Sequence, residues 1–96
     1  MEAAVPYPFT TSGTVGPQNA NGYVWVHGFS ARETGGTNGV TVTFRENTSS
    51  GKIVGEFSLS ASAGLGNGIL PKFKVNGQVY ITVGGSGTVS AVLYVS

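Results

Sequence analysis

Cysteine and aspartate are both missing from this chain of 96 residues, and charged residues of any kind make up only 9% of it. Without cysteine, neither a disulfide nor a thiolate metal site can stabilise the fold. Without aspartate, a calcium site would lack a common ligand, and a Ser-His-Asp triad would need glutamate as its acid. The sequence therefore predicts no metal site and no cofactor.

The few charges are nearly balanced, with five basic residues against four glutamates and a net charge of +1. The basic residues are not clustered, which argues against binding to a phosphate backbone. No apolar run approaches the roughly 20 residues that span a bilayer, and the first residues do not resemble a signal peptide. So little charge leaves a monomer poorly protected against association, and we therefore expect a homo-oligomer that binds neither nucleic acid nor membrane.

What the sequence does contain is repeated alternation of apolar and polar residues. Val40, Val42 and Phe44 alternate with Thr41 and Thr43, a period of two that places one face of a strand on a core. Strands are expected near residues 8–15, 22–32, 39–46, 52–59, 71–75, 78–83 and 88–95. Seven short strands at this spacing predict an all-β fold, a single small antiparallel β-sandwich of jelly-roll or Ig-like type, with a small barrel as the alternative. The predicted core consists of Val40, Val42, Phe44, Phe57, Leu59, Val79, Ile81, Val83 and Leu93, and Ile53 shares the spacing of Phe57 and Leu59.

Turn signals separate these strands. Residues 34–39 divide two strands that we interpret as one hairpin ribbon over 29–47, and Asn76 with Gly77 is a strong short hairpin signal because both accept a positive φ. Residues 60–70 form the longest expected connection, where a strand would cross between sheets.

Residues 1–9 are predicted to be an extended N-terminal arm, and residues 10–96 the sandwich domain. Pro6 and Pro8 flank Tyr7 and cannot lie in a central strand, so this segment is an edge strand or an arm. The arm either folds over its own sandwich or docks on a neighbouring subunit.

The residues that could do chemistry are few. His27 lies within a strand, which favours a structural role over a catalytic or metal-binding one. A two-carboxylate glycosidase would need two of Glu33, Glu46 and Glu56 across a cleft, which so small a domain rarely encloses. We therefore expect no enzyme and no catalytic residues.

Two Arg-Glu pairs also stand out. Arg32 with Glu33 and Arg45 with Glu46 are interpreted as residues on the solvent face of strands, where charged side chains protect edges and form weak cross-strand pairs.

Four aromatic residues occupy every second position of one predicted strand, so their side chains would lie on the same face. They are Tyr23, Trp25, His27 and Phe29. If the valines between them form the core, this row faces outward, where Tyr and Trp suit a protein interface or a sugar-stacking platform. If the row is core, the valines face out.

The order of these segments resembles the pattern found in a group of small virion proteins of tailed bacteriophages. The matching residues are 32–34, which end a strand before a glycine-rich loop, 40–51 (VTVTFRENTSSG), and 78–94, which close the chain. The resemblance implies a β-sandwich without an active site.

It also implies a capsid decoration or cement protein, or a head-fibre component, with a tail- or collar-associated protein as one alternative. Virion proteins would then be its partners, and it would be made in the host cytoplasm and located in the virion. A carbohydrate-binding sandwich that contacts a surface glycan is a second alternative, and a small hydrolase is the last. The expected interface residues are Val5, Tyr7, Phe9, Tyr23 and Trp25.

Overall fold

The computed structural model describes the backbone of residues 4–96 and the side chains of residues 4–64 and 72–96. This part of the chain forms strands and contains no helix. The strands are β1 (Val5–Phe9), β2 (Gly13–Val15), β3 (Tyr23–Glu33), β4 (Val40–Glu46), β5 (Ile53–Leu59), β6 (Gly64–Asn76), β7 (Val79–Gly85) and β8 (Val89–Val95).

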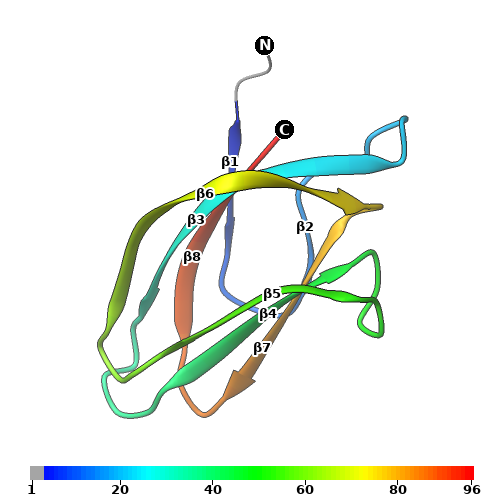
Figure 1. Ribbon diagram of the computed structural model, residues 1–96. Helices are drawn as coiled ribbons and strands as arrows, with labels where there is room; N and C mark the ends of the chain where they lie inside the picture. The colour runs from blue at the N-terminus through cyan, green and yellow to red at the C-terminus, as the bar shows by residue number, and fades with distance from the viewer. Residues whose placement is uncertain (1–3) are drawn as a thin grey trace.

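The strands form two four-stranded antiparallel sheets that pack face to face (Figure 1). We call the sheet β1-β8-β3-β6 sheet A and the sheet β2-β7-β4-β5 sheet B. This strand order is that of an eight-stranded jelly roll, so the predicted β-sandwich is confirmed and its topology is the jelly-roll rather than the Ig-like one. Only β4 and β5 are both consecutive and paired, and every other connection passes from one sheet to the other.

Two predicted hairpins are therefore wrong. The ribbon over residues 29–47 does not exist as a hairpin, because β3 belongs to sheet A and β4 to sheet B. Asn76 and Gly77 likewise stand at a corner between β6 and β7 rather than in a hairpin, although Gly77 has the expected positive φ of 77°. A turn signal predicts that the chain reverses, whereas the choice of pairing partner depends on how both sheets cover one core.

The predicted strand over residues 8–15 is divided. Residues 10–12 are exposed and carry the chain from β1 at the edge of sheet A to β2 at the edge of sheet B. β1 pairs antiparallel with β8, with Val5 opposite Val95 and Phe9 opposite Ala91. The segment predicted as an arm thus supplies an edge strand of its own sandwich, and its residues 1–3 lie outside the described residues.

The predicted connection over residues 60–70 is mostly strand. β6 begins at Gly64, and Gly64 and Leu65 pair with Arg32 and Ala31 of β3. The glycine-rich composition concealed this strand, since glycine gives no alternation of side chains from which a strand could be predicted.

The core between the sheets contains most of the residues predicted for it. Among these, Val40, Val42, Phe44, Leu59, Val79, Ile81 and Leu93 are buried, and Phe57 and Val83 are partly buried against them. Ile53 was grouped with them wrongly and is 49% exposed. The register of β5 shifts between Gly55 and Ile53, which turns Ile53 outward and packs Val54 against the core.

Three phenylalanines from both sheets join in the middle of this core. The ring of Phe29 stacks on that of Phe57 with centroids 4.6 Å apart, and Phe44 lies against both at 5.4 and 5.7 Å. Gly55 faces Phe44 in the register, and a Cβ there would lie 3.2 Å from the Phe44 ring, so the glycine provides room for it.

Candidate functional site

The strand that carries the aromatic row changes faces part-way along. Val24 and Val26 are buried, so the residues that alternate with them, Tyr23, Trp25 and His27, face outward and are half-buried. The pairing of β3 shifts register between Val26 and Gly28. This bulge reverses the alternation, and it explains why Phe29 packs in the core instead of continuing the row.

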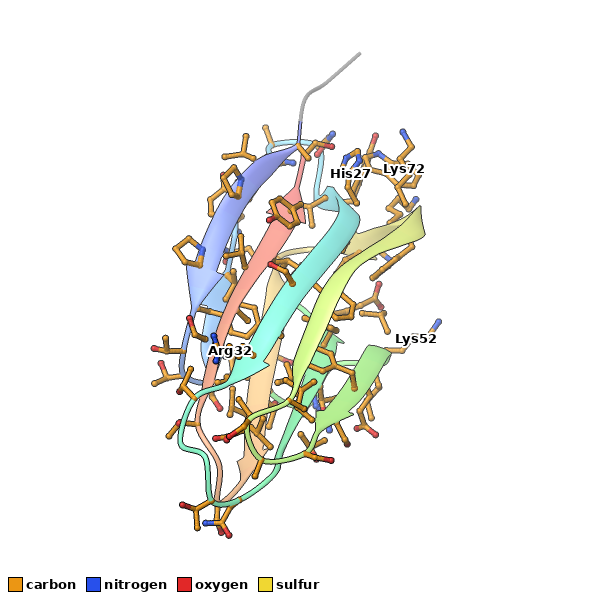
Figure 2. All side chains as sticks on the ribbon, turned by 90° about the vertical axis from the view of Figure 1, so that its left-hand side faces the viewer. His27, Arg32, Lys52 and Lys72 are labelled. Carbon is orange, nitrogen blue, oxygen red and sulfur yellow. The ribbon has the colours of Figure 1, made fainter. Side chains whose placement is uncertain are left out.

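Two lysines of β6 lie over the outward-facing rings. The Lys72 Nζ atom is 4.9 Å from the centroid of Trp25, and the Lys74 Nζ atom is 5.0 Å from that of Tyr23. The two rings meet edge to face with centroids 6.2 Å apart. We call these four residues together with His27 the aromatic patch. Figure 2 shows sheet A from its outer side, with His27 and Lys72 close together at the end where the N-terminus leaves.

An open depression of about 780 Å³ lies at this patch. His27 Nε2 and Ser96 Oγ are hydrogen-bonded at 2.7 Å and both line it. The Asn19 side chain donates to the Tyr23 carbonyl at 3.1 Å, which fixes the loop beside the rings. One face of each ring is covered by an ammonium group, and this leaves less ring surface for the sugar stacking that the outward row suggested.

The opposite end of the sandwich is organised around Glu33. Its side chain is 1% exposed, and its carboxylate accepts four backbone hydrogen bonds. The donors are the N–H groups of Gly35 at 2.8 Å, Gly36 at 2.8 Å, Ser62 at 3.0 Å and Thr88 at 2.9 Å.

These donors belong to the turns β3–β4, β5–β6 and β7–β8, which meet at one end of the molecule (Figure 1). The expectation that Glu33 lies on a solvent face is thus wrong, because the altered alternation of β3 points it inward, while Arg32 beside it is exposed.

The hydrogen bonds explain the acidity of this group. Backbone N–H groups of Ser62, Thr88 and Gly36 stabilise the charged carboxylate, with a further one from Gly35, and they lower the pKa of Glu33 from 4.5 to about 2. Burial acts in the opposite direction and is outweighed. Glu33 is therefore an ionised structural group that holds three turns together.

The other two described glutamates lie elsewhere. Glu56 accepts a hydrogen bond from Thr43 Oγ1 at 2.9 Å on the outer face of sheet B, and Glu46 accepts one from the backbone N–H of Asn76 at 2.9 Å. Asn76 pairs with Tyr23 at the start of β3, whereas Glu33 is the last residue of that strand, so the two lie at opposite ends of the sandwich. The structure thus does not bring Glu33, Glu46 and Glu56 together into a two-carboxylate site.

No three metal-binding side chains cluster in the described part of the chain. The same part has no helix that could cross a membrane.

The five predicted interface residues fall into two groups. Tyr23 and Trp25 lie on the outer face of sheet A. In β1, Phe9 is buried in the core, Tyr7 packs against it, and Val5 is 48% exposed. The structure therefore separates the outward Tyr23 and Trp25 of β3 and the exposed Val5 from the inward Tyr7 and Phe9 of β1, and their role in an interface stays a prediction.

Comparison with known proteins gives a likeness in fold. No protein-family model matches the chain, and neither does any curated protein. One solved structure matches with a TM-score of 0.59 and 16% sequence identity, over 96% of this chain and 80% of the other. It belongs to Bacillus endospore appendages, which are described as a novel family of disulfide-linked pili.

This finding corrects the expected function. The fold is similar to that of an appendage protein, so the expectation of a bacteriophage capsid decoration or head-fibre protein is wrong. At 16% identity the likeness establishes the β-sandwich fold alone. The expected location in a virion came from the resemblance to virion proteins, and it stays a prediction.

Sequence reasoning missed the two most specific features of the molecule. Lys72 and Lys74 have the spacing of two residues that puts them on one face of a strand, a signal that was available once residues 71–75 were predicted as strand. The Glu33 site could not be recognised locally, because Gly35 and Gly36 follow it directly but Ser62 and Thr88 lie 29 and 55 residues away.

Proposed function

We propose that the protein is a non-enzymatic structural subunit that assembles with copies of itself, with the outer face of sheet A in contact with a neighbouring copy. The observation that carries the proposal is the chemistry of this face. It bears rings, prolines and aliphatic groups where an isolated sandwich would present polar residues. Its outward residues of this kind are Pro6, Pro8, Tyr23, Trp25, Val92 and Tyr94, which lie beside the polar side chains of His27, Arg32, Lys72 and Lys74.

The outer face of sheet B differs. Hydroxyl residues predominate on it: Thr41, Thr43, Ser58 and Thr82 lie beside a single ring, Tyr80, and the exposed Ile53. Thr41 and the buried Thr43 are hydrogen-bonded to their neighbours across the strands. Threonine and serine are ordinary for a solvated sheet face, whereas exposed aromatic rows are enriched at interfaces. The difference between the faces makes sheet A the favoured contact.

Size allows such a contact. A standard interface covers roughly 800 Å² on each partner. The molecule extends 41 by 28 Å along its two longer axes, so one broad face has enough area. Likeness in fold to a subunit of endospore pili adds support, because that protein is part of an appendage.

The proposal that it is not an enzyme is supported by the positions of its titratable groups. Glu33 is engaged by four backbone donors, Glu46 and Glu56 by one donor each at separate places, and His27 is hydrogen-bonded to Ser96. The contact of His27 with Ser96 has the length expected between a serine nucleophile and its base, but the three described glutamates are engaged elsewhere, so none of them orients the His27 ring as the acid of a triad would.

Light scattering on the purified protein tests the proposal. We expect masses that are multiples of 9.8 kDa and that rise with concentration. Trp25→Ala should shift the distribution toward smaller species at equal concentration, whereas Tyr80→Ala, which removes a ring from the outer face of sheet B, should leave it unchanged. A wild-type protein that stays monomeric at all concentrations overturns the proposal, and equal effects of the two variants overturn the choice of face.

A further inference from the structure

Strand β1 can pair with another strand on one side only. Pro6 lies opposite Tyr94 and Pro8 opposite Val92, and proline has no backbone N–H. In an antiparallel pair, alternate residues direct both N–H and C=O toward the partner, so Val5, Tyr7 and Phe9 must make the bonds to β8. Pro6 and Pro8 then present carbonyls but no N–H at the outer edge, where a further strand would need donors.

The inward-facing side chains of β1 pack in the core. Phe9 is 7% exposed among the buried residues, and Tyr7 packs against the same cluster. These contacts are made with β8 and with the core beneath it, and every copy of the chain offers the same surface. A β1 strand from a second copy would reproduce each contact.

A short hinge joins β1 to the rest of the molecule. The hydroxyl of Ser12 accepts a hydrogen bond from the Val83 N–H at 2.9 Å, which ties the start of β2 to β7. Thr10 and Thr11, both exposed, are the residues between this point and Phe9. A change of backbone direction at these two residues is enough to turn β1 away from its own sandwich.

We infer that β1 is an exchangeable strand, which in the assembled protein leaves its own sheet and occupies the edge of β8 in a second copy. The inference rests on the proposed self-assembly and names the contact that links successive copies. Each copy donates one strand and accepts one, which gives a closed dimer when two copies exchange reciprocally and a ring or filament when the exchange runs head to tail. The prolines keep sheet A from pairing with further chains at this edge, so exchange is the pairing that β1 permits.

A cysteine pair tests this directly because the chain has no cysteine of its own. Pro8→Cys and Val92→Cys face each other on the outer side of sheet A. Pairs of this non-hydrogen-bonded kind have Cα atoms about 4.5 Å apart, within the range for a disulfide. Oxidation of the assembled double variant should give covalent dimers or a ladder of larger covalent multimers on a non-reducing gel, and these should collapse to the monomer on reduction.

The matched control is Thr41→Cys with Ser58→Cys, a pair that faces across the β4–β5 hairpin, where the native hydroxyls are 3.2 Å apart. It should give an oxidised monomer only. A mixture of Pro8→Cys chains with Val92→Cys chains should form covalent heterodimers, while each single variant alone should not.

The outcomes separate the two proposals. Multimers by light scattering together with covalent dimers or the covalent ladder support strand exchange. Multimers by light scattering with only an internally cross-linked monomer overturn exchange and leave self-assembly standing. A monomer in both measurements overturns the proposed function, and exchange with it.

Discussion

The two ends of the sandwich hold their charges in opposite ways. At one end, the Glu33 carboxylate is buried and receives four backbone N–H groups from three turns. At the other end, Lys72 and Lys74 lie on the surface over the rings of Trp25 and Tyr23. The first arrangement ties distant segments of the chain together, whereas the second joins two neighbouring strands and leaves its charges accessible.

Under the proposed assembly, this difference separates an end that contributes to the fold from an end that is available for contact with another copy. A buried carboxylate is tolerated only where its hydrogen-bonding capacity is filled, so the Glu33 end depends on every donor being in place. Lysines over exposed rings contribute little to stability, because water competes for the ammonium groups. We therefore expect substitutions at the Glu33 end to affect folding and those at the aromatic patch to affect association.

The largest loss of stability should come from a substitution in the core between the two ends. This loss is the standard against which substitutions at either end are compared. Phe44→Ala removes a ring that contacts Phe29 and Phe57, and it should lower the free energy of unfolding by roughly 3–5 kcal/mol. Urea denaturation measures this, with the outer-face substitution Tyr80→Ala as a control that loses much less. A loss below about 1 kcal/mol for Phe44→Ala would mean that Phe44 does not face the core.

Next in size should be the loss of the Glu33 carboxylate. Glu33→Ala removes the acceptor of four backbone donors, but their residues are exposed, so water can reach the donors once the carboxylate is gone. We therefore expect a lower melting temperature, by less than for Phe44→Ala. Hydrogen exchange should become faster at the amides of Gly35, Gly36, Ser62 and Thr88.

Added formate should restore part of the melting temperature of Glu33→Ala, because it can occupy the vacated donors, and it should not affect the wild type. Glu56→Gln is the matched control, since that carboxylate receives one hydroxyl rather than four amides. Unchanged exchange at the four amides in Glu33→Ala would contradict a role for Glu33 in holding the turns.

Acid should weaken the same end gradually. The pKa of Glu33 is about 2 in the folded protein against an ordinary value of 4.5, so its contribution is complete above pH 4.5 and is lost as the pH falls from there toward 2. The difference in melting temperature between wild type and Glu33→Gln should therefore shrink over this interval. A difference that stays constant between these pH values would show that the carboxylate is not stabilised in its charged form.

The smallest effect should be at the aromatic patch. Lys72→Gln removes one cation–π contact and should cost about 0.5–1 kcal/mol of stability. It should also change the fluorescence of Trp25, the single tryptophan of the chain. Lys52→Gln, which removes an exposed lysine elsewhere, is the control, and an equal loss in both variants would show that the contact with Trp25 contributes nothing.

Much of the fold could be predicted because alternation is a local property. Val40, Val42 and Phe44 are buried as their spacing requires, and so are Val79 and Ile81. The errors occurred where local signals failed. Ile53 follows an irregularity in β5, Phe29 follows a bulge in β3, and the glycine-rich start of β6 has no alternation to detect.

The candidate site was predicted only in part. The outward position of Tyr23 and Trp25 was one of two open alternatives. A strand with valines on one face and aromatic residues on the other can bury either face. The role of Glu33 could not be predicted at all. Its identity as a carboxylate is local, but its partners are brought to it by the meeting of three turns.

The sequence by itself determined that this is a small all-β sandwich without disulfides, because the period of two, the turn residues and the absence of cysteine are properties of the chain alone. Only the tertiary structure decided that the sheets are β1-β8-β3-β6 and β2-β7-β4-β5, that Glu33 is buried, and that Pro6 and Pro8 face the outer edge of sheet A. The physical reason is that strand pairing satisfies backbone groups equally well with many partners. The partner is chosen by which arrangement buries all the apolar faces at once.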